Sequence, residues 1–123
     1  MEKRRSYDLE KRTSKFGEEI ITFVKTVPKD VITRPLITQL IKAGTSIGAN
    51  YCEANDAESK KDFCHKLGIT RKESKETCFW LQMIAKACPE SKQQGRILWK
   101  EAKELNLIFS SIIRKARSSN PAE

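Results

Sequence analysis

Cysteine and histidine are the side chains of this sequence best suited to nucleophilic or metal chemistry. The chain has a single histidine, His65, which directly follows Cys64. Neighbouring residues of a helix point about 100° apart, so this pair does not face each other as a nucleophile and its base would. None of the four cysteines belongs to a C-x-x-C pair of the kind that holds zinc. We therefore expect no enzymatic activity, no metal and no cofactor.

The segment KAGTSIGAN, residues 42–50, places small residues where a phosphate-binding loop could want them. Its spacing matches neither the Walker loop nor the dinucleotide fingerprint. Gly44 and Gly48 fit the small-x-x-x-small motif of membrane helices, but Lys42 and Glu53 leave too short an apolar run to span a bilayer. The spacing therefore predicts close packing between two helices of a protein without a membrane partner.

Three polar residues in and just after this segment, Ser46, Asn50 and Glu53, follow helical spacing and share one face. Asn50 falls within the apolar stripe, where burial of an amide without a hydrogen-bond partner costs about 1–3 kcal/mol. One interpretation is structural: the motif ties this helix to a polar partner. The plausible partners are Lys72, Glu73, Glu76 and Thr77. The other interpretation, a ligand or RNA site within the bundle, stays open.

Helical periodicity dominates the chain, and strand signals are nearly absent. Four segments carry apolar stripes, and the second stripe consists of Leu36, Leu40, Ala43, Ile47, Asn50 and Ala54. We predict helices over about 7–27, 35–55, 59–88 and 91–117. Short connections favour an all-α, up-down-up-down antiparallel four-helix bundle, a single domain over residues 1–117 with a flexible tail over 118–123.

The helix boundaries follow from prolines and from capping patterns. Arg34-Pro35 is expected to open the second helix. Ser59 with Asp62, and Ser91 with Gln94, resemble capping boxes for the third and fourth helices.

Basic residues give the best functional lead, because the formal charge is +8. The predicted topology gathers the start of the first helix, the start of the third and the end of the fourth at one end of the bundle. The candidate nucleic-acid-binding residues there are Lys3, Arg4, Arg5, Lys11, Arg12, Lys60, Lys61, Arg114, Lys115 and Arg117. Such an end could bind phosphates through counterion release. Tyr7 and Tyr51 are the aromatic residues near it, and a merely solvated charged surface is the alternative.

The order of polar residues in QLIKAGTSIGANYCEAN, and in KESKETCFWL further along, resembles the 23S rRNA intervening-sequence protein family. The resemblance covers about residues 16–117. The chain departs from the family where Ile41 and Lys42 replace two arginines and where Ala54 replaces a glycine. The resemblance implies a small bacterial cytoplasmic bundle that forms a ring-like homo-oligomer, with a pentamer expected, and that has no established enzymatic activity.

These observations predict a non-enzymatic oligomeric bundle whose basic end binds RNA or DNA, or a nucleoprotein complex. The alternative is a protein-interaction adaptor. It would resemble the accessory protein of diversity-generating retroelements in architecture and charge, and it would bind a reverse transcriptase.

Overall fold

Four long α-helices run alternately up and down in the part of the chain that the structure describes. The computed structural model describes the backbone of residues 2–118 and the side chains of residues 8–118. The helices are α1 (Glu2–Thr26), α2 (Thr33–Asn55), α3 (Lys60–Ala87) and α4 (Lys92–Ser118), and a short 3₁₀ helix, η1 (Pro89–Ser91), precedes α4. No strand occurs in residues 2–118, which confirms the predicted all-α four-helix bundle.

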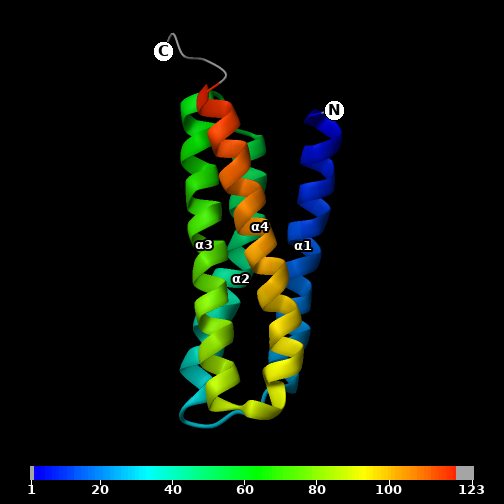
Figure 1. The fold of residues 1–123 in the computed structure, drawn as a ribbon, viewed down its shortest axis with the longest axis vertical. Coiled ribbons are helices and arrows are strands. Elements are labelled where there is room, and N and C mark those ends of the chain that lie inside the picture. Colours follow the sequence, from blue (N-terminus) through cyan, green and yellow to red (C-terminus); the bar gives the residue numbers. More distant parts are fainter. Residues whose placement is uncertain (1, 119–123) are drawn as a thin grey trace.

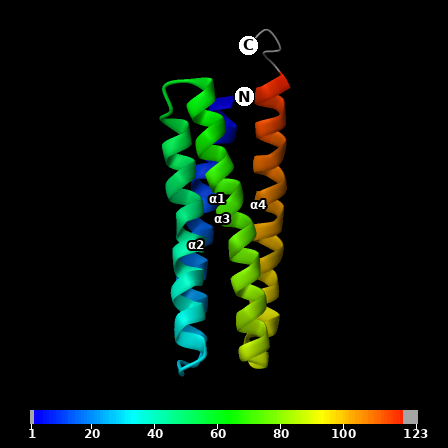
Figure 2. The ribbon, with the colours of Figure 1, turned by 90° about the vertical axis from the view of Figure 1, so that its left-hand side faces the viewer.

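The two ends of the bundle differ in which connections they hold. Figures 1 and 2 show the start of α1, the α2–α3 turn and the end of α4 at one end. The α1–α2 loop and η1 lie at the opposite end. We call these the terminal end and the η1 end. The topology therefore brings together the helix ends that the sequence predicted to meet.

Local hydrogen bonds explain where the helices begin. The Asp30 carboxylate accepts the backbone N–H groups of Ile32 and Thr33, each at 2.8 Å, while the Thr33 hydroxyl accepts the Asp30 N–H at 2.9 Å. These hydrogen bonds hold the pKa of Asp30 below its usual value, and the bond from the backbone N–H of Thr33 has the largest effect. Because this exchange fixes the first turn, α2 begins at Thr33 and not at about residue 35. Similarly, α1 already begins at Glu2, earlier than the predicted residue 7.

The two predicted capping boxes have different outcomes. The Ser59 hydroxyl accepts the Asp62 N–H at 3.0 Å, so Ser59 caps α3 as expected. Ser91 does not cap the fourth helix in the predicted way, because it lies in η1 and its hydroxyl contacts the Cys88 thiol at 3.3 Å. η1 runs directly into α4, and the Lys92 N–H bonds back to the Pro89 carbonyl.

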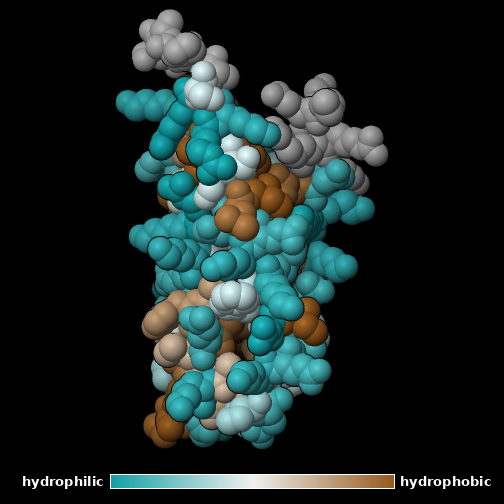
Figure 3. Space-filling model, in the orientation of Figure 1, coloured by the Kyte–Doolittle hydropathy of each residue, from teal (hydrophilic) through white to brown (hydrophobic). Residues whose placement is uncertain are grey.

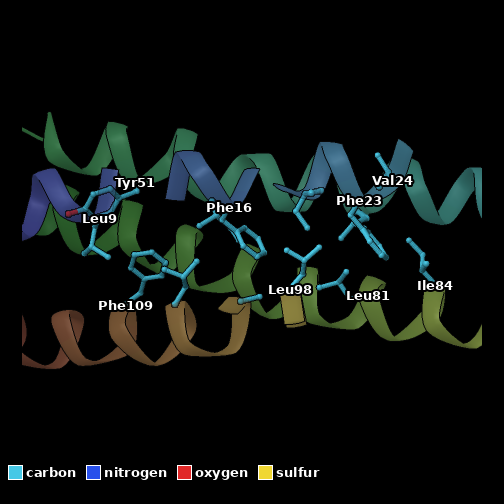
Figure 4. Close-up of a cluster of buried hydrophobic side chains, with 14 of the residues drawn as sticks. Leu9, Phe16, Phe23, Val24, Tyr51, Leu81, Ile84, Leu98 and Phe109 are labelled. Carbon is cyan, nitrogen blue, oxygen red and sulfur yellow. The ribbon is translucent and has the colours of Figure 1, made fainter. Parts of the chain in front are cut away.

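A continuous apolar core fills the interior along the whole bundle, as Figure 4 shows for side chains from all four helices. The predicted stripe of α2 is wrong near its ends. Ile37 and Tyr51 are buried there, whereas Leu36 and Asn50 are only half-buried. α2 packs against both α1 and α3, so its buried side extends beyond a single stripe.

The glycines of residues 42–50 lie where α2 meets α1. A Cβ atom added to Gly44 would lie 2.9 Å from Cγ1 of Ile20, and one added to Gly48 would lie 3.4 Å from the carbonyl oxygen of Thr13. The segment is therefore a close helix–helix contact, as its spacing predicted. Within the described residues, no helix is long and apolar enough to cross a membrane.

Candidate nucleic-acid interface

The predicted basic residues at the terminal end separate into several groups. Lys3, Arg4 and Arg5 lie in the first turns of α1, and their side chains are outside the described part of the chain. Lys61 is exposed at the start of α3, and Lys60 beside it is half-buried. Three exposed residues complete the end of α4: Arg114, Lys115 and Arg117.

Arg12 takes part in a different interaction from the predicted one. Its guanidinium makes a bidentate contact with Glu101 of α4, at 2.7 and 2.8 Å, and reaches Glu104 at 3.1 Å. The hydrogen bond to Glu101 is the main reason why the pKa of Arg12 lies above its usual value. Arg12 therefore joins α1 to α4, and its charge is balanced within the bundle. Lys11, its neighbour, is exposed on α1.

The turn between α2 and α3 makes part of the terminal end acidic. An open groove there is lined by four carboxylates, from Glu53, Asp56, Glu58 and Asp62. The Lys66 ammonium pairs with Glu53 at 2.9 Å, and this hydrogen bond raises the pKa of Lys66. The terminal end therefore carries charges of both signs. The order of the helices alone could not show this, because it does not specify where the acidic side chains lie.

The polar motif of α2 contacts α3 at two points. Glu53 pairs with Lys66, a residue outside the set of predicted partners. The Ser46 hydroxyl donates to the Lys42 carbonyl of its own helix at 2.5 Å and also lies close to the Glu73 carboxylate of α3. Burial, and then the charge of Glu76, raise the pKa of Glu73. Asn50 does not reach α3, because its amide donates to the Ser46 carbonyl of its own helix at 2.9 Å. The motif therefore links α2 to α3 through its first and last members.

Carboxylates of α3 and α4 are directed away from one long side of the bundle. On α3, Glu73 contacts Ser46 of α2, and Asp62 lines the groove with the end of α2. Glu76 follows Glu73 by three residues and accepts the Trp80 indole N–H at 3.3 Å. On α4, both acidic residues bind Arg12 of α1. Glu90, in η1, is the remaining acidic residue between positions 60 and 118.

Basic residues occupy the long side of the bundle from which these carboxylates point away. On α3 the exposed positions repeat at helical spacing along one outer stripe. On α4 a matching stripe borders α3, since the Asn106 amide donates to the Arg71 carbonyl at 2.9 Å and the Cys78 thiol lies 3.8 Å from the Trp99 carbonyl. We call the exposed cations of these two stripes the α3–α4 face: Lys61, Lys72, Lys75, Lys86, Lys92, Arg96, Lys103, Arg114 and Arg117. Figure 3 shows hydrophilic residues over much of this side of the molecule.

The sequence prediction identified only the terminal part of this face. It contained Lys61, Arg114 and Arg117, while Lys115 follows Arg114 by one residue and so points about 100° away. The signal for the rest was present in the sequence. Between Lys61 and Lys86, the positions at i, i+4 and i+7 spacing include four lysines and no acidic residue.

Of the two tyrosines predicted near the basic end, the side chain of Tyr7 lies outside the described part of the chain. Tyr51 is buried in the core, with its ring 5.8 Å from that of Phe109, and so does not offer a surface for stacking. Phe79 lies on the outer stripe of α3 with 48% of its surface exposed. Trp99 is half-buried between the two stripes, and the Lys103 ammonium lies 5.2 Å from the centre of its ring. The structure thus places aromatic side chains among the cations.

The candidate residues for catalysis and metal binding are not brought together. Cys64 is buried and His65 is exposed. Across the residues that the structure describes, no three histidine, cysteine, aspartate or glutamate side chains are arranged to hold a metal ion.

Comparisons with known proteins agree with the fold. One similar structure is the crystal structure, at 1.70 Å resolution, of a protein of unknown function from the S23 ribosomal protein family of Bacteroides thetaiotaomicron. It shares 29% sequence identity with this chain at a TM-score of 0.78, over 89% of this chain and 97% of that one. The search of curated proteins found no match. Residues 5–111 match the profile of the 23S rRNA-intervening sequence proteins, and the chain belongs to that family.

Proposed function

We propose that this protein is a non-enzymatic nucleic-acid-binding bundle whose α3–α4 face contacts the phosphate backbone of RNA or DNA. The observation that carries the proposal is the sorting of charge on α3 and α4. Asp62 and Glu73 lie toward α2, Glu76 accepts the Trp80 N–H, and the two carboxylates of α4 bind Arg12. The exposed stripes between them carry cations and no acidic residue. A surface of one sign of charge attracts a polyanion with little repulsion from nearby carboxylates.

The length of the face suits a polymer better than a small anion. Lys61 and Lys86 stand 25 positions apart in one helix, and a helix rises about 1.5 Å per residue, so the face extends over roughly 37 Å. Contacts spread over such a length release several counterions at once. A ring of identical subunits, which the family resemblance implies, would add the contacts of several copies.

A pair of charge-reversal variants tests the proposal. The face variant carries Lys72→Glu, Lys75→Glu and Arg114→Glu. The control carries Lys15→Glu, Lys25→Glu and Arg34→Glu, which change the net charge equally at exposed positions of α1 and α2. Binding to labelled RNA and DNA is measured by fluorescence anisotropy over a series of salt concentrations.

We expect the face variant to lose affinity by at least about 100-fold, and its salt slope to fall by about 3, because three phosphate contacts are removed. The control should keep the slope of the parent protein. Equal losses in the two variants would mean that only net charge matters. Absence of binding by the parent protein at low salt would overturn the proposal and direct the search to protein partners.

A further inference from the structure

An open pocket lies between α3 and α4 near the η1 end, far from the basic end that the sequence predicted. Its volume is about 280 Å³. Leu81, Ala85 and Gly95 give its lining an apolar part, which we call the floor, and Trp99 contributes an aromatic ring, which we call the wall. Ala85 contributes only a methyl group there, so space remains beside the ring. The pocket therefore offers a flat ring and small apolar groups to a ligand.

Positively charged groups surround this apolar floor. Lys92 and Arg96, one turn apart on α4, line the pocket and are exposed. Lys103 adds a third charge, because its ammonium lies over the Trp99 ring. Gln82, also in the lining, carries an amide that can both donate and accept hydrogen bonds. An apolar recess with cations at its rim is complementary to a ligand with a flat ring joined to negative charge.

We propose that this pocket receives an unpaired base of single-stranded nucleic acid, while Lys92 and Arg96 bind the adjacent phosphates. This inference rests on the proposed function, and it deepens that function by naming the form of nucleic acid. Every base has a π-face that can stack on an aromatic ring, so the contact does not require one sequence. Bases of an intact duplex are stacked and paired, and they cannot enter without being unstacked. The protein should therefore prefer single strands.

The surroundings of the pocket make this preference separable from simple charge attraction. The cations at its rim continue the α3–α4 face, so a duplex can still bind along the face through its phosphates. Only the floor and the Trp99 wall distinguish an unpaired base. A variant that fills the floor and keeps every cation should therefore lose the preference for single strands and retain duplex binding.

The test uses the full chain with three probes: a labelled single-stranded RNA, the single-stranded DNA of the same sequence, and the corresponding DNA duplex. The Ala85→Leu variant fills the floor of the pocket. Ala49→Leu is the matched control, because it makes the same substitution at an exposed position of α2, outside the α3–α4 face. Far-UV circular dichroism verifies that each variant is folded.

A second measurement needs no substitution in the pocket. The chain has two tryptophans, Trp80 and Trp99. In a Trp80→Phe background the fluorescence comes from Trp99 alone. Stacking of a base should quench this fluorescence when a single strand is added, whereas the duplex should change it much less.

We expect the parent protein to bind single strands about 5- to 150-fold more tightly than Ala85→Leu does, the range that one stacked base contributes. The two single-stranded probes show whether RNA or DNA supplies the base. Equal affinity of the parent protein for single strands and duplex, or absence of Trp99 quenching on binding, would overturn the pocket proposal and leave the phosphate-binding proposal intact. If no probe binds the parent protein, both proposals fail.

Discussion

Substitution of two glycines by alanine tests how tightly α1 and α2 are packed. Gly44 and Gly68 both lie inside long helices, so alanine gains the same intrinsic helix propensity at each, about 1 kcal/mol. Their surroundings differ. A Cβ added to Gly68 meets no atom within 4 Å, whereas one added to Gly44 lies 2.9 Å from Cγ1 and 3.2 Å from Cγ2 of Ile20.

A Cβ atom at position 44 could be accommodated only at a cost in free energy. Ile20 is fully buried, so it cannot turn toward solvent, and either its rotamer or the spacing of α1 and α2 must change. Overpacking of this kind typically costs about 1–3 kcal/mol. After the gain in propensity, Gly44→Ala should be destabilised by roughly 0–2 kcal/mol. Gly68→Ala should instead be stabilised by up to about 1 kcal/mol.

Urea unfolding followed by circular dichroism measures both free energies of unfolding. All variants are compared at one protein concentration, because subunit association would make stability depend on concentration. The informative quantity is the difference between the two variants, expected to be about 1–3 kcal/mol. If Gly44→Ala proves as stabilising as Gly68→Ala, the contact with Ile20 is looser than the structure implies and the packing argument is refuted.

Two further predictions concern the Ser59 cap of α3 and the half-buried carboxylate of Glu73. Ser59→Ala removes the acceptor for the Asp62 N–H and should lower the free energy of unfolding by about 1 kcal/mol, while Ser14→Ala at an exposed site of α1 should change it by less than about 0.5 kcal/mol. Burial raises the pKa of Glu73 in the folded protein above its pKa in the unfolded chain. The ionised carboxylate therefore lowers the free energy of unfolding above the folded pKa, and this loss disappears as the pH falls below the unfolded pKa. Glu73→Gln should therefore be more stable than the parent protein at neutral pH and lose this advantage in acid. Unfolding curves across a pH series would contradict the reasoning if the advantage grew on acidification.

The helices and most of the core could be predicted from the sequence. Apolar residues repeated at helical spacing lie on one face of a helix, and that face is buried against the other helices. On α3 even Thr70, Ser74 and Thr77 follow this rule. They are fully buried, and each hydroxyl donates to the backbone carbonyl four residues earlier. The prediction failed at the ends of α2, where Ile37 and Tyr51 replace Leu36 and Asn50, because contact with two neighbouring helices widens the buried side.

The candidate site could be predicted only in part. Topology correctly gathered the helix ends, but it does not specify the rotation of each helix about its axis. That rotation decides that Arg12 meets Glu101 and that Glu73 faces Ser46. Pairing across helices therefore determines which charges remain at the surface. Because of this pairing, the candidate interface lies on the long side formed by α3 and α4 and not at the terminal end.

The ion pair of Arg12 has a consequence for motion. α1 packs mainly on α2 and lies farther from α4, and Arg12 with Glu101 and Glu104 adds a polar link to α4 beside the apolar core. These side chains are partly exposed, and dissolved ions weaken such pairs. As ionic strength rises, backbone amides of α1 should exchange their hydrogens with solvent faster, through local opening, while those of α3 stay protected by packing on two sides. The dynamics of α1 would then respond to the salt content of its surroundings, and α1 would be the helix from which the bundle first begins to open.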